Sequence, residues 1–312
     1  KKFYYWDVIY LNDLNVIFAG CAKNCEKYLP DVFNNIQSYS SLFKKTFKII
    51  VENGSTDDTK KILKTYQNYE SIVHFRDDFN LIEHRTTRLA LARNLIIKEI
   101  KNNQKLKDFH LLIMIDFDDR GIFKVDENNL IKAIEFLFSK NNIAGVFGNQ
   151  PGLYFDMWAL RDQYDFESDY FGDALKFATA KMQSTEKINK EILLDLKKNY
   201  FDKKKISFPI NSSPIKVISA FGGLGIYKIK KIRDNKNIYE GEQEISIRFK
   251  DGVNKKISYQ RCEHKSFHQG FYDINTDLFI LPYLINSQKI DYEVFPQTAF
   301  ALVINKRNLD IF

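Results

Sequence analysis

Short apolar runs alternate with amphipathic stretches through the first 115 residues of the chain. The apolar runs have the length of buried strands and occupy residues 16–20, 47–51, 72–75 and 111–115. The stretches between them repeat apolar residues at helical spacing and predict helices over about 25–39, 55–69 and 86–101. Alternation of this kind is typical of a mostly parallel sheet with helices on both faces. The pattern therefore predicts an α/β, Rossmann-like fold.

The pattern is less regular in the second half. Apolar spacing predicts helices over 130–138 and 185–200, and short apolar runs predict strands near 145–148 and 278–281. The segment 230–256 is rich in Lys, Asn and Asp, and we expect it to be a surface insertion. With 312 residues, the chain is long enough for one large domain with a substantial core. We expect such a domain, with an irregular second half.

Polar residues directly follow two of the predicted strands. Glu52 and Asn53 follow the second strand, and Asp116 and Asp118 follow the fourth. Ser55 is placed to cap the helix that comes next, because a serine three residues before an acidic residue is typical of a helix start. Ligands of open parallel sheets sit beyond the carboxyl ends of the strands. We therefore expect the functional site at this edge of the sheet.

Asp116 and Asp118 are the most informative pair in the sequence. An apolar strand ends in two carboxylates spaced i and i+2, which places both on one side of the chain end. Hard divalent ions such as Mn²⁺ or Mg²⁺ prefer oxygen ligands of this kind and keep coordination sites for phosphate oxygens. A solvated acidic turn is the alternative. A metal ion held by these carboxylates would stabilise the negative charge that develops on a diphosphate leaving group.

The chain has a formal net charge of +7 and a pI near 9.0, which suits an anionic partner. Its lysines are spread along the sequence without a helix-turn-helix, zinc-finger or RNA-recognition motif, so we expect no nucleic-acid partner. Three cysteines without a CxxC pair indicate a reducing compartment. No run approaches the roughly 20 apolar residues of a membrane helix. We expect a cytoplasmic protein, with peripheral membrane association as an alternative.

Three segments together resemble the nucleotide-binding half of GT-A glycosyltransferases. They are residues 16–24, the Val-Glu-Asn-Gly-Ser-Thr-Asp-Asp-Thr stretch at 51–59, and Asp-Phe-Asp at 116–118. In the large family 2 of these enzymes the second strand ends in Val-Asp-Asn/Asp-Gly-Ser-x-Asp, and Glu52 stands here in place of the first Asp. The resemblance implies that the donor nucleotide is contacted by Ala19, Cys21, Glu52, Asn53 and Asp57.

A basic pattern opens the helix predicted before the fourth strand. Arg85 and Arg88 lie at i and i+3 near its start, where the helix dipole also favours anions. They begin an Arg-Thr-x-Arg-Leu-Ala-x-x-Arg-Asn pattern, of which Ala-Arg-Asn is similar to family 2. The whole pattern resembles the fungal capsule-associated mannosyltransferases and their bacterial or viral relatives. The further donor contacts that the resemblance implies are Arg85, Arg88, Arg93, Asn94 and Asp116.

Two later segments resemble acceptor-side parts of the same enzymes. The aromatic-Asp-x-Trp-x-x-Arg-Asp stretch at 155–162 also resembles the mannosyltransferase relatives. The glycines at 222 and 223 resemble a segment that lines the acceptor side, where glycine permits close backbone approach. The implied acceptor contacts are Trp158, Arg161, Asp162, Gly222 and Gly223.

Two segments compete to supply the catalytic base. The stretch at 241–244 resembles the Gly-Glu-Asp pattern of inverting family 2 enzymes, but Gln243 occupies the Asp position, so inversion and retention both stay open. The Cys-Glu-His stretch at 262–264 resembles the mannosyltransferase relatives, and we prefer its glutamate. The catalytic candidates are Glu263, Glu242 and Asp119. The residues that could complete the metal shell, or meet the leaving phosphate, are His264 and His268.

The leading hypothesis is a metal-dependent glycosyltransferase that moves a hexose from a UDP- or GDP-sugar to a glycan, lipid-linked or protein acceptor. The resemblance implies a GT-A domain with a nucleotide-sugar-binding half at 1–125 and an acceptor-binding half at 126–312. A mannosyltransferase is one form of this hypothesis. The alternatives are a sugar nucleotidyltransferase, which usually opens with a Gly-rich loop that 20–24 lacks, and an inactive nucleotide-sugar-binding protein.

Overall fold

The computed structural model describes residues 10–162, 205–248 and 254–288, together with residues 195, 198, 202 and 252. The helix predicted over 185–200 therefore lies, apart from residues 195 and 198, outside the described residues. Within the described part of the chain, no helix is long and apolar enough to cross a membrane.

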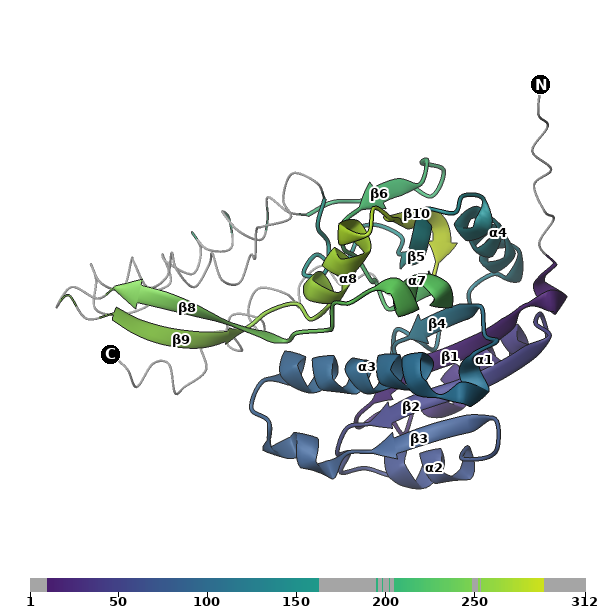
Figure 1. The fold of residues 1–312 in the computed structure, drawn as a ribbon, viewed down its shortest axis with the longest axis horizontal. Helices are drawn as coiled ribbons and strands as arrows, with labels where there is room; N and C mark the ends of the chain where they lie inside the picture. The colour runs from purple at the N-terminus through teal and green to yellow at the C-terminus, as the bar shows by residue number, and fades with distance from the viewer. Residues whose placement is uncertain are drawn as a thin grey trace.

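One eight-stranded sheet forms the centre of the fold (Figure 1). Its strands are β1 (Asn15–Ala22), β2 (Lys45–Glu52), β3 (Ser71–Phe75), β4 (Leu111–Ile115), β5 (Ile143–Asn149), β6 (Ile215–Val217), β7 (Leu224–Lys228) and β10 (Asp277–Ile285). They lie in the order β3-β2-β1-β4-β7-β5-β10-β6. β1 to β4 are parallel to one another and β5 is parallel to β10, whereas β7 and β6 are antiparallel to their neighbours. Strands from both halves of the sequence thus share a single, mostly parallel sheet.

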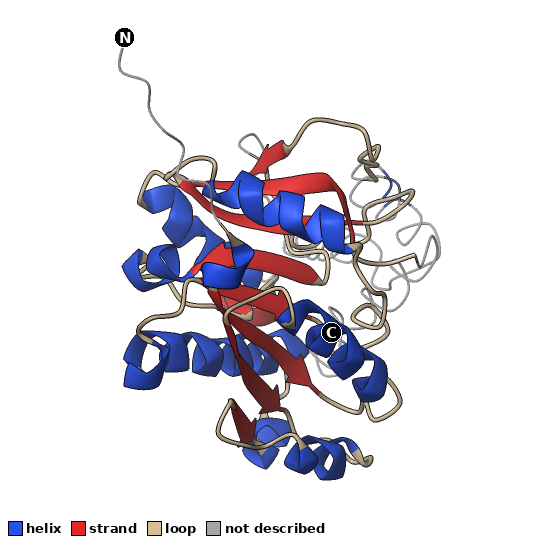
Figure 2. Ribbon diagram, turned by 90° about the vertical axis from the view of Figure 1, so that its right-hand side faces the viewer, coloured by secondary structure: helices blue, strands red, loops and turns tan. Residues whose placement is uncertain are grey.

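Helices cover both faces of this sheet (Figure 2). They are α1 (Leu29–Ser40), α2 (Thr59–Thr65), α3 (Arg85–Asn102), α4 (Glu127–Phe138), α7 (Ile229–Asp234) and α8 (His264–Asp273), with short 3-10 turns at Leu11–Asp13, Asp77–Leu81 and Gln104–Leu106. Along β1, Ile17 and Ala19 join the core under α3, α7 and α8, while Val16 and Phe18 join the core under α1, α2 and α4. Side chains of a strand alternate between its two faces, so one strand supplies both cores.

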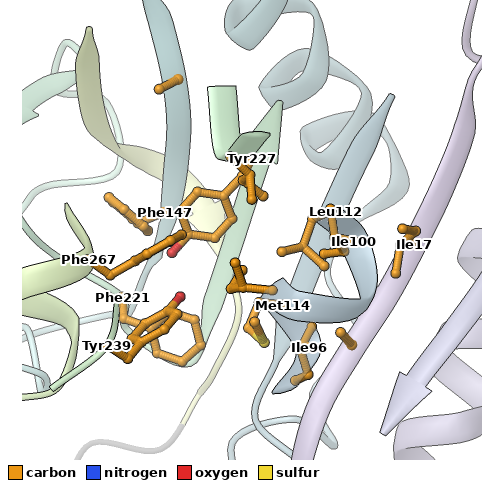
Figure 3. Close-up of a cluster of buried hydrophobic side chains, with 14 of the residues drawn as sticks. Ile17, Ile96, Ile100, Leu112, Met114, Phe147, Phe221, Tyr227, Tyr239 and Phe267 are labelled. Carbon is orange, nitrogen blue, oxygen red and sulfur yellow. The ribbon is translucent and has the colours of Figure 1, made fainter. Parts of the chain in front are cut away.

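The core beneath α3 holds this helix against the middle of the sheet (Figure 3). Ile96 and Ile100 of α3 belong to the same buried cluster as Ile17 of β1 and Leu112 and Met114 of β4. The aromatic continuation of this cluster consists of Phe147, Phe221, Tyr227, Tyr239 and Phe267. Burial of large aromatic rings contributes strongly to core stability, which accounts for much of the high aromatic content of the chain.

The structure confirms the predicted strands and the long helix, but it corrects two local predictions. The helix expected from about residue 25 begins at Leu29, after a turn in which Asn24 has a φ of +51°. Ser55 does not cap α2, which begins at Thr59. Its hydroxyl instead accepts a hydrogen bond of 2.9 Å from the Asn24 backbone N–H. Ser55 therefore joins the loops that follow β1 and β2.

The segment 230–256 is not a simple surface insertion. It contains most of α7, whose Ile229 and Ile232 are buried, and it leads into a hairpin. The hairpin consists of β8 (Glu242–Arg248) and β9 (Asn254–Gln260), which pair only with each other and extend away from the central sheet (Figure 1). The sequence pattern did not predict the hairpin, because charged residues interrupt the alternation of apolar and polar positions that is typical of a strand.

Asn94 fastens α3 to the chain that leads into the hairpin. Its side-chain amide donates to the carbonyl of Tyr239 and accepts from the N–H of Tyr239, both at 2.9 Å. These two bonds pair the backbone carbonyl and N–H of Tyr239, which lies in a segment without regular secondary structure. The side chain of Tyr239 is buried. Both polar groups of the Asn94 side chain are thus engaged within the fold, and its donor contact stays a prediction.

We predict that Asn94→Ala lowers the free energy of unfolding by about 2–4 kcal/mol, because two backbone groups of Tyr239 lose their partner. Urea unfolding measures the loss. Asn102→Ala, at an exposed position on the same helix, is the control and should change stability by less than about 0.5 kcal/mol. Equal stability of the two variants would contradict the proposed role of Asn94.

Candidate active site

A cavity of about 490 Å³ opens at the carboxyl ends of the parallel strands. β1, β2 and β4 reach it with Cys21, Asn53 and Asp116, and α3 contributes residues of its first three turns. The ends of parallel strands converge at one edge of the sheet, so residues far apart in the sequence meet there. The predicted site residues in its wall are Cys21, Asn53, Arg85, Arg88, Arg93, Asp116, Asp118, Trp158, Glu263 and His264.

The turn after β4 presents the two aspartates. The backbone N–H of Asp116 donates to the carbonyl of Gly223 at 3.0 Å, so the start of this turn is tied to the segment before β7. The carboxylate of Asp118 accepts from the backbone N–H of Arg120 at 3.0 Å. Both carboxylates line the cavity, as the i, i+2 spacing predicted.

Gly222 and Gly223 bring backbone close to these acids. Their φ angles are +65° and +84°, a conformation that favours glycine. A Cβ atom on Gly223 would lie 3.5 Å from a carboxylate oxygen of Asp116, and the N–H of Gly222 donates to Asp156 at 3.0 Å. The two glycines thus form backbone hydrogen bonds with the acidic residues. Neither glycine lines the cavity, where the predicted acceptor contact would have to lie.

Buried Arg93 connects two acidic residues of the cavity. It forms an ion pair with Glu263 and lies 3.5 Å from a carboxylate oxygen of Asp116. Its guanidinium also lies 5.0 Å from the centroid of the Phe221 ring. Only 5% of the Arg93 side chain is exposed, so its charge is balanced mainly by these two carboxylates. Arg93 therefore positions acidic groups and has little surface left for the predicted donor contact.

Burial changes the ionisation of the pocket groups. It raises the pKa of Asp116 to about 7; the neighbouring Asp118 adds to this rise and Arg93 opposes it. Burial also raises the pKa of Asp156, while the N–H of Gly222 opposes the rise. The thiol of Cys21 has a pKa raised to about 12, again mainly by burial, and stays neutral. The cavity thus holds carboxyl groups whose negative charge is only partly compensated.

The histidines do not complete a metal shell with the two aspartates. His268 is fully buried, and its ring nitrogens are hydrogen-bonded to Ser219 at 3.0 Å and Tyr227 at 2.9 Å, which contradicts a ligand role. His264 stacks on Phe221 with ring centroids 4.3 Å apart, and burial lowers its pKa well below the usual value. Among the described residues, no three His, Cys, Asp or Glu side chains converge on a common point.

The structure separates several other predicted residues from the cavity. Ala19 is fully buried within β1 and does not line the cavity. Arg161 is 1% exposed and donates to the carbonyls of Trp158 and Leu160, and it does not line the cavity either. Glu242 lies on the hairpin with a side chain 53% exposed, where it is hydrogen-bonded to His84, outside the cavity wall.

Glu52 and Asp57 build the loop beside the cavity. Glu52 is fully buried and accepts a hydrogen bond from the N–H of Ser55. Asp57 accepts from the N–H groups of Glu26 at 3.2 Å and Thr59 at 3.0 Å. Neither they nor the remaining candidates Asp119 and Asp162 line the cavity. The Glu-Asn-Gly-Ser-Thr-Asp pattern therefore shapes the loop, and Asn53 alone of this stretch reaches the cavity wall.

Sequence reasoning did not assign roles to several cavity residues. Asp156 lines the cavity and accepts hydrogen bonds from the N–H groups of Gly222 and Ala159. The aromatic-Asp-x-Trp motif contains Asp156, but the resemblance implied acceptor contacts only for the later residues of that motif. Arg120, stacked over Phe155 at 4.3 Å, had no signal beyond its closeness to Asp118. The remaining unassigned residues of the wall include Lys23, Asn24, Leu89 and Phe221.

The acidic pair suits a hard divalent cation. Two carboxylates, Asp116 and Asp118, supply oxygen ligands in the same cavity wall. Mg²⁺ and Mn²⁺ are commonly held by one or two carboxylates, with phosphate oxygens and water completing the shell. The donor set at this cavity fits that pattern without a third protein ligand.

Comparison with solved structures finds matches at low sequence identity and low TM-score. S. aureus TarS 1–349 in complex with UDP-GlcNAc is 13% identical, with a TM-score of 0.45 over 96% of this chain and 66% of that chain. The Pyrobaculum calidifontis mannosyltransferase PcManGT in complex with GDP-Man and Mn²⁺ is 12% identical, with a TM-score of 0.46 over 93% of this chain and 61% of that chain. The chain spans between 35% and 66% of the length of the matched TarS chains.

A search of curated proteins finds no match. The profile described as Glycosyl transferase family 2 matches residues 21–181, just over half of the chain. This range contains the ends of β1, β2 and β4 and the first turns of α3, which together form much of the cavity wall. The chain therefore belongs to glycosyl transferase family 2, and its mostly parallel, helix-flanked sheet has the GT-A architecture that the sequence resemblance implied.

Proposed function

We propose that this chain is a metal-dependent glycosyltransferase that moves a hexose from a UDP- or GDP-sugar to a glycan, lipid-linked or protein acceptor. The observation that carries the proposal is the pair Asp116 and Asp118 at the carboxyl edge of the sheet, in a cavity that also contains arginines of α3. A sugar nucleotide presents two phosphates, and this combination of carboxylates and arginines suits a cation together with a diphosphate.

Arg85 and Arg88 are proposed to contact the donor phosphates. Both line the cavity at the amino-terminal end of α3, where the helix dipole also favours anions. Arg88 donates to the carbonyls of Ile82 at 2.5 Å and Glu83 at 3.1 Å, which fixes one side of its guanidinium. Asn53 and Cys21 are proposed to meet the nucleoside, since they line the same cavity from the ends of β2 and β1.

Asp116 and Asp118 would hold Mn²⁺ or Mg²⁺ between them and the donor. When bound, such an ion supplies positive charge that stabilises the departing nucleoside diphosphate. The acidic residues themselves hold the ion at the strand end, and Arg93 keeps the Asp116 carboxylate in place from the buried side. In this proposal residues 1–125 contribute most of the donor site and residues 126–312 contribute the acceptor site.

Asp156 is the group that we propose as the general base. It lines the cavity, and burial raises its pKa, which makes its carboxylate a stronger base than an ordinary aspartate. Glu263 also lines the cavity, but its ion pair with Arg93 occupies the carboxylate. Glu263 is then a positioning residue that holds Arg93, and through it Asp116.

Removal of one metal ligand tests the central proposal. Asp118→Asn keeps the hydrogen bond from Arg120 but weakens cation binding, and we expect kcat/KM for sugar transfer to fall about 10³-fold, as the loss of several kcal/mol implies. Calorimetry with Mn²⁺ and UDP or GDP should show the matching loss of affinity. Asp31→Asn, an exposed carboxylate at the start of α1, is the control. Retained Mn²⁺-dependent turnover in Asp118→Asn would refute the metal assignment.

The choice of base is tested with three matched carboxamide variants. We expect Asp156→Asn to lower kcat about 10²- to 10⁴-fold with little change in Mn²⁺ affinity. Glu263→Gln should weaken Mn²⁺ binding, because Arg93 then pairs more closely with Asp116. Glu242→Gln, on the exposed hairpin, should leave both quantities unchanged.

Kinetics and Mn²⁺ titration of the same protein samples separate these roles. Normal kcat in Asp156→Asn, with a collapse of kcat and ordinary Mn²⁺ affinity in Glu263→Gln, would transfer the role of base to Glu263. A loss of kcat in Glu242→Gln would show that the hairpin takes part in the reaction, and it would contradict the proposal that Glu242 is not the base.

A further inference from the structure

A second cavity lies at the opposite edge of the same sheet. Its volume is about 760 Å³, and Asn15, His110 and Lys228 line it. These residues stand at the start of β1, immediately before β4 and at the end of β7. Because β1 and β4 are parallel and β7 is antiparallel to β4, all three positions fall at the amino-terminal edge of the parallel strands. β4 and β7 therefore connect this cavity to the candidate active site at their other ends.

The wall of this second cavity is strongly basic. Five segments of the chain contribute to it, and two carboxylates, Asp13 and Asp108, are also present. The cationic side chains are Lys44, Lys107, Lys228, Lys230, Lys231 and Arg233. Across the described ranges, none of these six cations forms an ion pair with a carboxylate. A concave surface lined by one sign of charge concentrates the opposite charge from solution.

The burial of Lys228 is a second, independent indication of an anion site. It is only 8% exposed, and its ammonium donates to the carbonyl of Lys140 at 2.8 Å. The ammonium also lies 5.2 Å from the centroid of the Phe138 ring. Burial, with a further contribution from Lys231, lowers the pKa of Lys228 to about 8. A buried ammonium with a single carbonyl acceptor retains unused donors and would be stabilised by an anion in the cavity.

We propose that this basic cavity binds a phosphate-bearing anion, either a small soluble polyphosphate compound or the headgroup of an anionic phospholipid. Lysine and arginine are the usual partners of phosphate oxygens, and charge-assisted hydrogen bonds of this kind are strong. The volume falls in the range of small-molecule sites, which favours a compact ligand over a polymer. Its aromatic residues also offer no stacking platform, since Phe109 is buried and Lys228 lies over Phe138.

The site is independent of sugar transfer, because none of its residues lines the candidate active site. Binding is therefore measured directly, in a chelator that removes divalent ions from Asp116 and Asp118. One arm titrates the protein with tripolyphosphate in a calorimeter at low salt. The other arm sediments the protein with vesicles of phosphatidylcholine alone or of phosphatidylcholine mixed with phosphatidylglycerol. The two arms distinguish a soluble ligand from a lipid headgroup.

Two double variants of equal charge provide the comparison. Lys44→Gln with Lys230→Gln neutralises two exposed lysines of the cavity. Lys98→Gln with Lys132→Gln neutralises two exposed helical lysines that line neither cavity. We expect the cavity variant to lose affinity about 10-fold or more for tripolyphosphate, or about 25-fold for the anionic vesicles, and the control to lose far less. Lys228→Met, which removes the buried ammonium, should weaken binding as well.

Variant-sensitive binding in either arm supports the proposal and identifies the source of the phosphate. Absence of binding in both arms overturns it. Equal losses in the cavity variant and the control also overturn it, because they would show that net charge alone attracts the anion. Thermal unfolding of the exposed double variants establishes that they remain folded, so the test does not depend on the buried Lys228.

Discussion

The ion pair between Arg93 and Glu263 is the interaction on which the candidate active site depends. It joins α3 to the residue that immediately precedes α8, across 170 residues of sequence. The same guanidinium lies 3.5 Å from Asp116, at the end of β4, so three elements meet at one buried charge. A buried arginine is unfavourable unless carboxylates balance it, and breaking such a pair from one side is strongly destabilising. The second half of the chain is thereby anchored to the strand end that carries the acidic pair.

The two edges of the sheet carry cavities that differ in charge. At the carboxyl edge, acidic groups and the arginines of α3 share one cavity, so both signs of charge are present in its wall. At the amino-terminal edge, lysines outnumber carboxylates and face a cavity of their own. Because β4 and β7 span the distance between these cavities, the hydrophobic run at 111–115 has a double role. It builds the core, and it fixes the separation of two charged sites.

The first half of the fold could be predicted from sequence because its signals are local. Buried strands such as 111–115 are continuous apolar runs, and α3 repeats its apolar residues at helical spacing over five turns. The position of Asp116 and Asp118 followed from the same pattern, since the end of a parallel strand is set by the strand itself. Local sequence was therefore sufficient wherever a residue's role depends on its own element.

Residues whose surroundings depend on distant partners could not be placed from sequence. Histidine is a residue type that commonly binds metal ions, but both ring nitrogens of His268 are hydrogen-bonded to Ser219 and Tyr227. Asn94 adjoins Arg93 in a family-like motif, yet its amide faces Tyr239. β7 enters the sheet between β4 and β5, and no sequence periodicity indicates that order. Partners that lie more than 40 residues away cannot be identified from one sequence, and they decided these assignments.

Some buried polar atoms at the candidate active site lack a hydrogen-bond partner within the part of the protein that the structure describes. Among the described residues, Asn53 Oδ1 and His264 Nδ1 are buried without a hydrogen-bond partner, and both residues belong to the wall of the candidate active site. Glu52 Oε2, in the adjoining loop, is in the same state. Each such atom costs about 1–3 kcal/mol relative to a satisfied one. Elsewhere in the described chain, atoms in the same state also occur away from the cavity, at Asn149 Oδ1, Gln150 Oε1 and Gln269 Oε1. The position of Asn53 and His264 in the cavity wall distinguishes them, because a ligand in the cavity that pairs with either atom would recover part of this cost.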